Sequence, residues 1–218
     1  MIKSVISDLG KVLIFFDNNI FFEKMADYCP FSGKEISAMV SEHLSIIELM
    51  DTGKISPRVF YKKVTEILSA EINYSTFFSI YNNIFSLNPP VLKVMKILKP
   101  EYRLVLLSNT DIMRFNFVKK KFPEAFIFDE YVLSFEVGYV KPHPKIFEKA
   151  LEKAEAEAFE CVFIDDRKEN VEFAQTLGMH TVHFRDEIEL ERELRGKGLF
   201  LSLPGSKLKM SIFDNHVD

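Results

Sequence analysis

Residues 161–184 have the sequence CVFIDDRKENVEFAQTLGMHTVHF, which predicts a strand, a helix and a second strand in succession. The runs 161–164 and 180–184 are nearly continuous in apolar side chains, as strands are when both faces of a parallel sheet are covered. Between them, residues 168–177 have the apolar spacing of a helix. A strand–helix–strand unit of this kind is typical of an α/β protein with a parallel sheet.

Two further apolar runs, residues 2–7 and 103–107, extend this pattern toward the N-terminus. Helical patterns at residues 144–157 and 187–195 accompany the later strands. Because predicted strands and helices alternate, we expect an α/β fold of the Rossmann-like type, in which a doubly wound parallel sheet has helices on both faces.

The segment that follows the first strand has a different character, because no strand is apparent from residue 17 to about residue 86. Ser32 and Glu35 have the spacing of a helix-capping box, and the aromatic stretch 74–85 is predicted to be one helix. Asn88, Pro89 and Pro90 then interrupt the helical pattern. The sequence therefore predicts a core and an inserted helical cap, with the core formed by residues 1–16 and 88–218 and the cap by residues 17–87.

Composition excludes several classes of protein. The 218 residues include 28 Lys and Arg against 32 Asp and Glu, a net charge of −4 that gives no electrostatic basis for non-specific binding to nucleic acid. Only two cysteines occur, and no uninterrupted apolar stretch is long enough to cross a membrane. We therefore expect a cytoplasmic protein without nucleic-acid or membrane partners. The sequence does not indicate an oligomeric state.

Polar residues stand at the ends of the predicted strands. Asp8 follows the first strand, Ser108 and Asn109 follow the second, and Asp165 and Asp166 follow a later one. Lys141 precedes the helix that leads to that later strand. Because ligands of open parallel sheets bind beyond the carboxyl ends of the strands, these side chains are expected to converge.

This set of residue types suits one reaction, in which a carboxylate attacks phosphorus and the resulting aspartyl phosphate is hydrolysed. A phosphate monoester is a dianion, so a carboxylate needs help to approach it. Magnesium held by Asp8 and the Asp165–Asp166 pair would offset the repulsion, and Lys141 would add a positive charge. The Ser108 hydroxyl would donate to a phosphate oxygen.

Four segments resemble, in order, the motifs of the haloacid dehalogenase superfamily. They are SDLGKVLIFFD (7–17), LVLLSNT (104–110), GYVKPHPKIFEKAL (138–151) and the opening segment 161–184. The helical insertion resembles the C1-type cap of that superfamily. The stretch DTGKISPRVF (51–60), together with Asp-Leu-Gly in the first motif, is similar to the bacterial α-glucose-1-phosphatase-like members.

The resemblance implies a magnesium-dependent phosphatase that acts on a small phosphorylated metabolite, with a sugar phosphate as the first candidate. It implies a role for each matching residue: Asp8 as nucleophile and metal ligand, Gly10 as a metal ligand through its backbone carbonyl, Ser108, Asn109 and Lys141 in phosphate binding, Asp165 and Asp166 in the metal site, and Asn170 in support of them. Lys141 also counts as catalytic in this scheme.

Gly10 departs from the pattern of the resembling phosphatases, most of which have a second Asp two residues after the nucleophile as general acid and base. Loss of such a group typically costs ~10² to 10⁴ in rate. Two alternatives therefore stay open: a binding protein that retains the site without turnover, and a dehalogenase that uses Asp8 on carbon. The Asp165–Asp166 pair disfavours the dehalogenase, because it indicates a metal.

Overall fold

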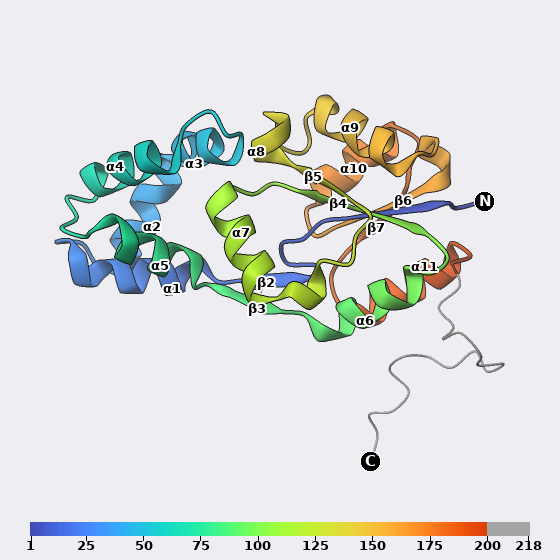
Figure 1. The fold of residues 1–218 in the computed structure, drawn as a ribbon, viewed down its shortest axis with the longest axis horizontal. Coiled ribbons are helices and arrows are strands. Elements are labelled where there is room, and N and C mark those ends of the chain that lie inside the picture. Colours follow the sequence, from blue (N-terminus) through green and yellow to red (C-terminus); the bar gives the residue numbers. More distant parts are fainter. Residues whose placement is uncertain (200–218) are drawn as a thin grey trace, which may run out of the picture.

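A five-stranded parallel sheet forms the centre of the core in the computed structural model, which describes residues 1–199 (Figure 1). The strand order is β5-β4-β1-β6-β7, and every neighbouring pair is parallel. The strands are β1 (Ser4–Ser7), β4 (Arg103–Ser108), β5 (Glu130–Leu133), β6 (Cys161–Asp165) and β7 (His180–His183). The predicted Rossmann-like α/β class is confirmed, and β1 occupies the middle of the sheet.

Helices cover both faces of this sheet, as Figure 1 shows. One face packs against α6 (Pro89–Leu98), α7 (Ile112–Lys121) and α11 (Glu187–Gly196), and the other against α9 (Pro144–Ala154) and α10 (Lys168–Thr176). Successive side chains of a strand point to opposite faces, so Val5 belongs to the first apolar cluster and Ile6 to the second. This double coverage explains the continuous apolar runs of the sequence.

Five α-helices between β2 and β3 form a separate body beside the sheet (Figure 1). They are α1 (Asn18–Met25), α2 (Gly33–Glu42), α3 (Leu44–Asp51), α4 (Pro57–Ile67) and α5 (Tyr74–Asn82). Their apolar faces meet in a cluster of their own, in which the Phe77 ring contacts Phe21 and Phe60 edge-on. A separate apolar cluster is the property expected of an inserted subdomain.

The predicted capping box at the start of α2 is present. The Ser32 hydroxyl accepts from the Glu35 backbone N–H at 3.4 Å, and the Glu35 carboxylate accepts from the Ser32 backbone N–H at 2.8 Å. Two N–H groups at the helix end, which have no partner within the helix, are satisfied in this way.

The connection between the core and the helical body differs from the sequence prediction. The helix predicted over residues 74–85 ends at Asn82, and a two-stranded antiparallel ribbon joins β2 (Ile14–Phe16) to β3 (Phe85–Leu87). The pairing of Phe16 with Phe85 places the two crossings of the chain side by side. Each strand is only three residues long and its partner is distant in sequence, so local periodicity gave no signal. The cap boundaries at residues 17 and 87 stay a prediction.

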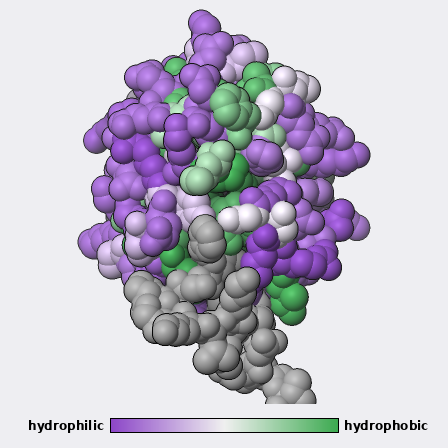
Figure 2. All heavy atoms as spheres, turned by 90° about the vertical axis from the view of Figure 1, so that its right-hand side faces the viewer, coloured by the Kyte–Doolittle hydropathy of each residue, from purple (hydrophilic) through white to green (hydrophobic). Residues whose placement is uncertain are grey.

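The remaining elements are short: η1 (Ala26–Tyr28), η2 (Pro123–Ala125), α8 (Ser134–Val137) and η3 (Ala158–Glu160). Figure 2 views the end of the core remote from the helical body, and this face is mainly hydrophilic with a smaller group of hydrophobic side chains near its middle. Among residues 1–199 no helix has both the length and the apolar character that crossing a membrane requires. The predicted core extends to residue 218, of which residues 200–218 lie outside the described part.

Candidate active site

The carboxyl ends of β1, β4 and β6 bring most of the predicted site residues together. Asp8 follows β1, Ser108 ends β4 and Asp165 ends β6. The backbone N–H of Asp8 donates to the Ile164 carbonyl at 2.9 Å, which fixes the start of the loop after β1 against β6. Asp8, Gly10, Ser108, Asn109, Lys141, Asp166 and Asn170 line one cavity of about 490 Å³.

Lys141 is the cation of this cluster. Its Nζ lies 2.8 Å from Asp8 Oδ1 and 2.7 Å from Asp165 Oδ2, and it donates to the Leu107 carbonyl at 2.8 Å. The three donors of the ammonium therefore have three acceptors. Burial opposes the charge, but Asp165 and Asp8 outweigh it and hold the pKa of Lys141 above its ordinary value. The ammonium stays charged and ties β1 to β6.

Asn109 is placed next to Lys141 by a reciprocal pair of hydrogen bonds. The Lys141 backbone N–H donates to Asn109 Oδ1 at 2.7 Å, and Asn109 Nδ2 donates to the Lys141 carbonyl at 3.1 Å. Both polar atoms of the amide side chain are thus engaged with the Lys141 backbone. The substrate contact predicted for Asn109 stays a prediction, and the geometry gives it a positioning role through Lys141.

Three carboxylates gather around one point. Ligand oxygens of Asp8, Asp165 and Asp166 lie within 4.8 Å of one another. Burial raises the pKa of Asp8 to about 7; Lys141 opposes this rise and Asp165 adds to it. Burial and then Asp165 also raise the pKa of Asp166. The cluster holds more negative charge than one ammonium offsets, which is the electrostatic condition that a bound divalent cation relieves.

Asp165 and Asp166 differ in how their carboxylates are held. Asp165 Oδ1 accepts from the Arg167 backbone N–H at 2.8 Å and from Asn170 Nδ2 at 3.0 Å, while Oδ2 accepts from Lys141. Asp166 is partly exposed, and the Lys11 ammonium lies 3.9 Å from its Oδ2. Asn170 Oδ1 is buried without a hydrogen-bond partner among residues 1–199. This unpaired oxygen and the looser Asp166 carboxylate suit a hard, oxygen-binding cation such as Mg²⁺.

Gly10 lines the cavity close to Asp8 and brings no side chain into it. A Cβ at this position would lie 3.1 Å from Phe16 Cε1, so a larger residue would require the Phe16 ring to shift by a few tenths of an ångström. Position 10 therefore contributes only backbone atoms to the cavity.

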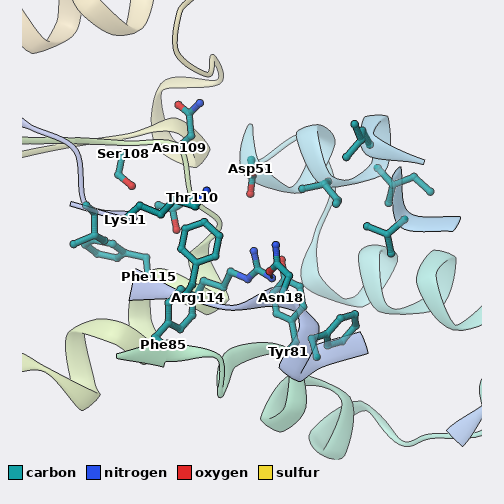
Figure 3. Close-up of a pocket in the computed structure, with 18 of the residues that line it drawn as sticks. Lys11, Asn18, Asp51, Tyr81, Phe85, Ser108, Asn109, Thr110, Arg114 and Phe115 are labelled. Carbon is teal, nitrogen blue, oxygen red and sulfur yellow. Dashed lines mark hydrogen bonds between the residues drawn. The ribbon is translucent and has the colours of Figure 1, made fainter. Parts of the chain in front are cut away.

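The helical body supplies the other wall of the cavity, and this wall is largely apolar. Its lining includes Phe21, Met39, Val40, Ile47, Phe60, Val64 and Leu68. Asn18, Asp51 and Tyr81 add polar groups to this wall, and Arg114 of α7 adds one from the core, as Figure 3 shows. None of these four was identified from the sequence. Asp51 begins the quoted stretch DTGKISPRVF and Arg114 lies in the first turn of the helix after Ser108-Asn109-Thr110, so position near known motifs is the signal that could have found them.

Comparison with known proteins matches residues 61–178 to the family model of haloacid dehalogenase-like hydrolases. The chain is similar to the D-ribitol-5-phosphate phosphatase of Bacteroides thetaiotaomicron, with 22% identity over 203 residues that cover 89% of this chain and 97% of the relative. It is also similar to the sesquiterpene phosphatase astK of Aspergillus oryzae, with 31% identity over 90 residues, which cover 41% of this chain and 46% of that protein.

The structure of the chain is also similar to solved structures. A HAD family enzyme from Bacteroides thetaiotaomicron, crystallised in complex with magnesium and inorganic phosphate, has a TM-score of 0.74 and 28% identity and covers 85% of this chain and 95% of its own. A predicted HAD-like family hydrolase from Porphyromonas gingivalis has a TM-score of 0.75 at 24% identity, over 89% of this chain and 98% of its own.

Proposed function

The chain belongs to the haloacid dehalogenase-like hydrolase family, and from this premise we propose that it is a magnesium-dependent phosphatase that hydrolyses a small phosphate monoester through a phosphorylated Asp8. The observation that carries the proposal is that Lys141 and the Asp165–Asp166 pair lie close to Asp8, at a cavity that Asp8, Lys141 and Asp166 line. The phosphatase relative and the structural neighbour that binds magnesium and inorganic phosphate support it.

Asp8 is the nucleophile in this reaction. One of its carboxylate oxygens forms a bond to phosphorus while the bond from phosphorus to the ester oxygen breaks, and the alcohol leaves with a proton from solvent. Water then attacks phosphorus, which frees inorganic phosphate and restores the Asp8 carboxylate. Asp8 Oδ1 accepts from Lys141 and from the Leu9 backbone N–H at 2.7 Å, so the carboxylate is oriented before substrate arrives.

The other residues divide between charge and position. The Lys141 ammonium adds positive charge beside the phosphate, and the buried Ser108 hydroxyl would donate to one of the phosphate oxygens. Asn109 and Asn170 hold Lys141 and Asp165. Asp8, Asp165, Asp166 and the backbone carbonyl of Gly10 would hold Mg²⁺, with Asp166 as the freer carboxylate. When bound, the ion would neutralise charge between the carboxylates and the phosphate dianion.

Gly10 limits the chemistry, because position 10 supplies no carboxylate that could protonate the leaving oxygen. The rate should therefore depend steeply on how well the leaving group bears negative charge. The same feature favours the rival function, a protein that binds a phosphorylated metabolite without turnover. Either function takes a small phosphorylated metabolite as its partner, and a sugar phosphate is our first substrate class, in line with the D-ribitol-5-phosphate phosphatase relative. The cytoplasmic location and the absence of nucleic-acid and membrane partners stay predictions.

Phosphate release from a series of aryl and alkyl phosphates, measured with Mg²⁺ and again with excess EDTA, tests the proposal. We expect Mg²⁺-dependent hydrolysis that is fastest for aryl phosphates and is abolished in Asp8→Asn, whose amide keeps the shape of the side chain without its nucleophilicity. Tight binding of phosphate esters without any cleavage would instead establish the rival function. Unaltered turnover in Asp8→Asn would refute the assignment of Asp8 as nucleophile and as metal ligand.

A further inference from the structure

Two polar side chains that the reaction does not use face the same cavity as Asp8. Asp51 is the last residue of α3, and Arg114 lies in the first turn of α7. Figure 3 shows Asp51 on a helix of the insertion, well apart from Ser108, and Arg114 reaching from the core toward Asn18 and Tyr81. The pair therefore lines the part of the cavity that lies away from the strand ends.

Arg114 is held in place with donors to spare. Its guanidinium carbon lies 4.0 Å from the centre of the Tyr81 ring, and the Tyr81 hydroxyl donates to Asp111 Oδ2 at 2.8 Å. The Asn18 side-chain oxygen is 3.5 Å from Nη2, the upper limit for a hydrogen bond. Arg114 Nε is buried and has no hydrogen-bond partner among the described residues, and Asp111 Oδ2 stands 3.9 Å from it. The group is fixed in direction but incompletely bonded.

The Asp51 carboxyl is also without a hydrogen-bond partner in the described part of the chain. Burial raises its pKa to about 7; nearby Asp111 adds to the rise, Arg114 opposes it and Glu48 adds slightly. The charges that act on Asp51 are thus different from those around Asp8. Asp51 is half-buried at the cavity wall, so its carboxyl lies where a ligand in the cavity can bond to it.

We propose that Asp51 and Arg114 together bind a hydroxyl group at the end of the substrate remote from its phosphate, so that the substrate is the phosphate monoester of a polyhydroxylated carbon chain. The inference rests on the proposed phosphatase function. A hydroxyl both donates and accepts, so one such group can donate to Asp51 while accepting from Arg114. Because one partner comes from the insertion and one from the core, the contact forms between the two parts of the molecule.

Other substrate ends satisfy this pair less well. A carboxylate or a second phosphate would pair with Arg114 but would stand against Asp51 and Asp111. An alkyl end would leave both polar groups unpaired in a wall that is otherwise largely apolar. A few polar groups in an apolar wall are what sets the orientation and specificity of a ligand.

The test compares three phosphate esters: D-ribitol 5-phosphate, n-pentyl phosphate of matched carbon number, and p-nitrophenyl phosphate. We expect the wild type to prefer the ribitol ester over the pentyl ester by about 10-fold or more in kcat/KM. Asp51→Ala and Arg114→Met should each lower the ratio of kcat/KM for ribitol phosphate to that for p-nitrophenyl phosphate by about 10- to 100-fold. The double variant should lose less than the product of the two effects, and Asp51→Asn, whose amide still donates and accepts, should retain more of the ratio than Asp51→Ala.

Arg58→Met is the matched control, because Arg58 also stacks on a tyrosine of the helical body, 5.6 Å from the centre of the Tyr74 ring, but does not line the cavity. Arg58→Met should keep the wild-type ratio of kcat/KM for ribitol phosphate to that for p-nitrophenyl phosphate. Wild-type hydrolysis of n-pentyl phosphate that is as fast as that of the ribitol ester, or faster, would overturn the inference. Equal losses of kcat/KM for ribitol phosphate and p-nitrophenyl phosphate in Asp51→Ala and Arg114→Met would overturn it as well.

Binding separates this inference from the proposed function. If the wild type hydrolyses no ester, the phosphatase assignment fails, and calorimetric titration of ribitol 5-phosphate into the Asp51→Ala and Arg114→Met variants then decides the inference. Weaker binding of the ribitol ester with retained binding of n-pentyl phosphate would support it, and unaltered binding of both would refute it.

Discussion

At the scale of single residues, Asp165 and Asp166 differ in burial and in the contacts that hold their carboxylates. Asp165 is fully buried and is held by Lys141, Arg167 and Asn170, whereas Asp166 is partly exposed and faces Lys11 at a longer distance. The two adjacent carboxylates look equivalent in the sequence. Their contacts give Asp165 a structural role and leave Asp166 freer to bind a cation.

This difference predicts that two matched substitutions affect different properties, one Mg²⁺ binding and the other stability. Asp166→Asn should weaken Mg²⁺ binding by about 10-fold or more, because a hard cation loses an anionic oxygen. The free energy of unfolding of Asp166→Asn, measured without metal, should change little. Asp165→Asn should lower the free energy of unfolding by about 3 kcal/mol, because it removes one partner of a buried ion pair. Calorimetry and urea denaturation measure the two quantities, and equal loss of stability in both variants would contradict the predicted difference.

Asp51 makes stability depend on pH. Its pKa rises from an ordinary 3.8 to about 7 on folding, so between these values the folded protein binds more protons than the unfolded chain. The cost of ionising Asp51 in the folded protein is absent below about pH 4, grows as the pH rises, and is complete above about pH 7. Asp51→Asn removes this cost, so the variant should gain stability relative to the wild type on going from pH 5 to pH 8.

Urea denaturation in EDTA at both pH values measures this gain. Asp27→Asn in η1 is the control, because Asp27 lies outside the cavity and the variant shows the effect of the same substitution elsewhere in the insertion. A stability difference between Asp51→Asn and the wild type that is the same at pH 5 and pH 8 would show that Asp51 is not buried as described.

At the scale of secondary-structure elements, four of the five α-helices of the insertion begin at a side-chain cap, and α3 does not. Ser32, Ser56 and Asn73 each accept a hydrogen bond from the backbone at the start of α2, α4 and α5. These caps are readable from sequence because the pattern is local. They fix where each helix starts and therefore which side chains reach the cavity.

Ser32→Ala should lower the free energy of unfolding by about 1 kcal/mol, because the Glu35 backbone N–H loses its acceptor and the reciprocal bond is weakened. Urea denaturation followed by circular dichroism measures the change. Ser41→Ala, at an exposed position near the end of the same helix, is the control. A loss no larger than that of Ser41→Ala would mean that the capping box contributes nothing to stability.

Strands were predictable from the sequence only where their burial requires a run of apolar residues. The runs of β1, β4 and β6 are largely apolar because helices cover both faces of the sheet, whereas the edge strand β7 buries only Val182. β5 escaped prediction because its four residues begin with Glu130 and Tyr131, which are only half-buried, so its strand conformation depends on pairing with β4. The ribbon of β2 and β3 escaped for the same reason, since its partners are about 70 residues apart.

At the scale of the whole molecule, the site divides into a part readable from the sequence and a part that needs the structure. Asp8, Ser108 and Asp165 stand at strand ends, and the order of strands in a parallel sheet is enough to bring them together. Asp51 and Arg114 line one cavity only because the insertion packs beside the core. No local pattern encodes that arrangement.

The paired strands β2 and β3 predict that the insertion can be removed. Phe16 and Phe85 are opposite each other, so a short linker from residue 16 to residue 88 spans little distance. We expect such a core to fold and to retain hydrolysis of p-nitrophenyl phosphate, but to lose the preference among alkyl phosphates because the wall that carries Asp51 is gone. Circular dichroism and kinetics check this, and a core that is expressed but unfolded would show that the insertion belongs to the main hydrophobic core.

Phosphorylation of Asp8 is the central claim, and Gly10 makes its detection favourable. A good aryl leaving group departs without a proton donor, whereas water must attack the aspartyl phosphate without a carboxylate base at position 10, so the second step should be the slower one. Rapid mixing of enzyme, Mg²⁺ and p-nitrophenyl phosphate should release a burst of p-nitrophenol close to one equivalent per site. Acid quenching followed by peptide mass spectrometry should place the phosphoryl group on Asp8. Turnover with no burst and no label on Asp8, or a label on another residue, would contradict the account.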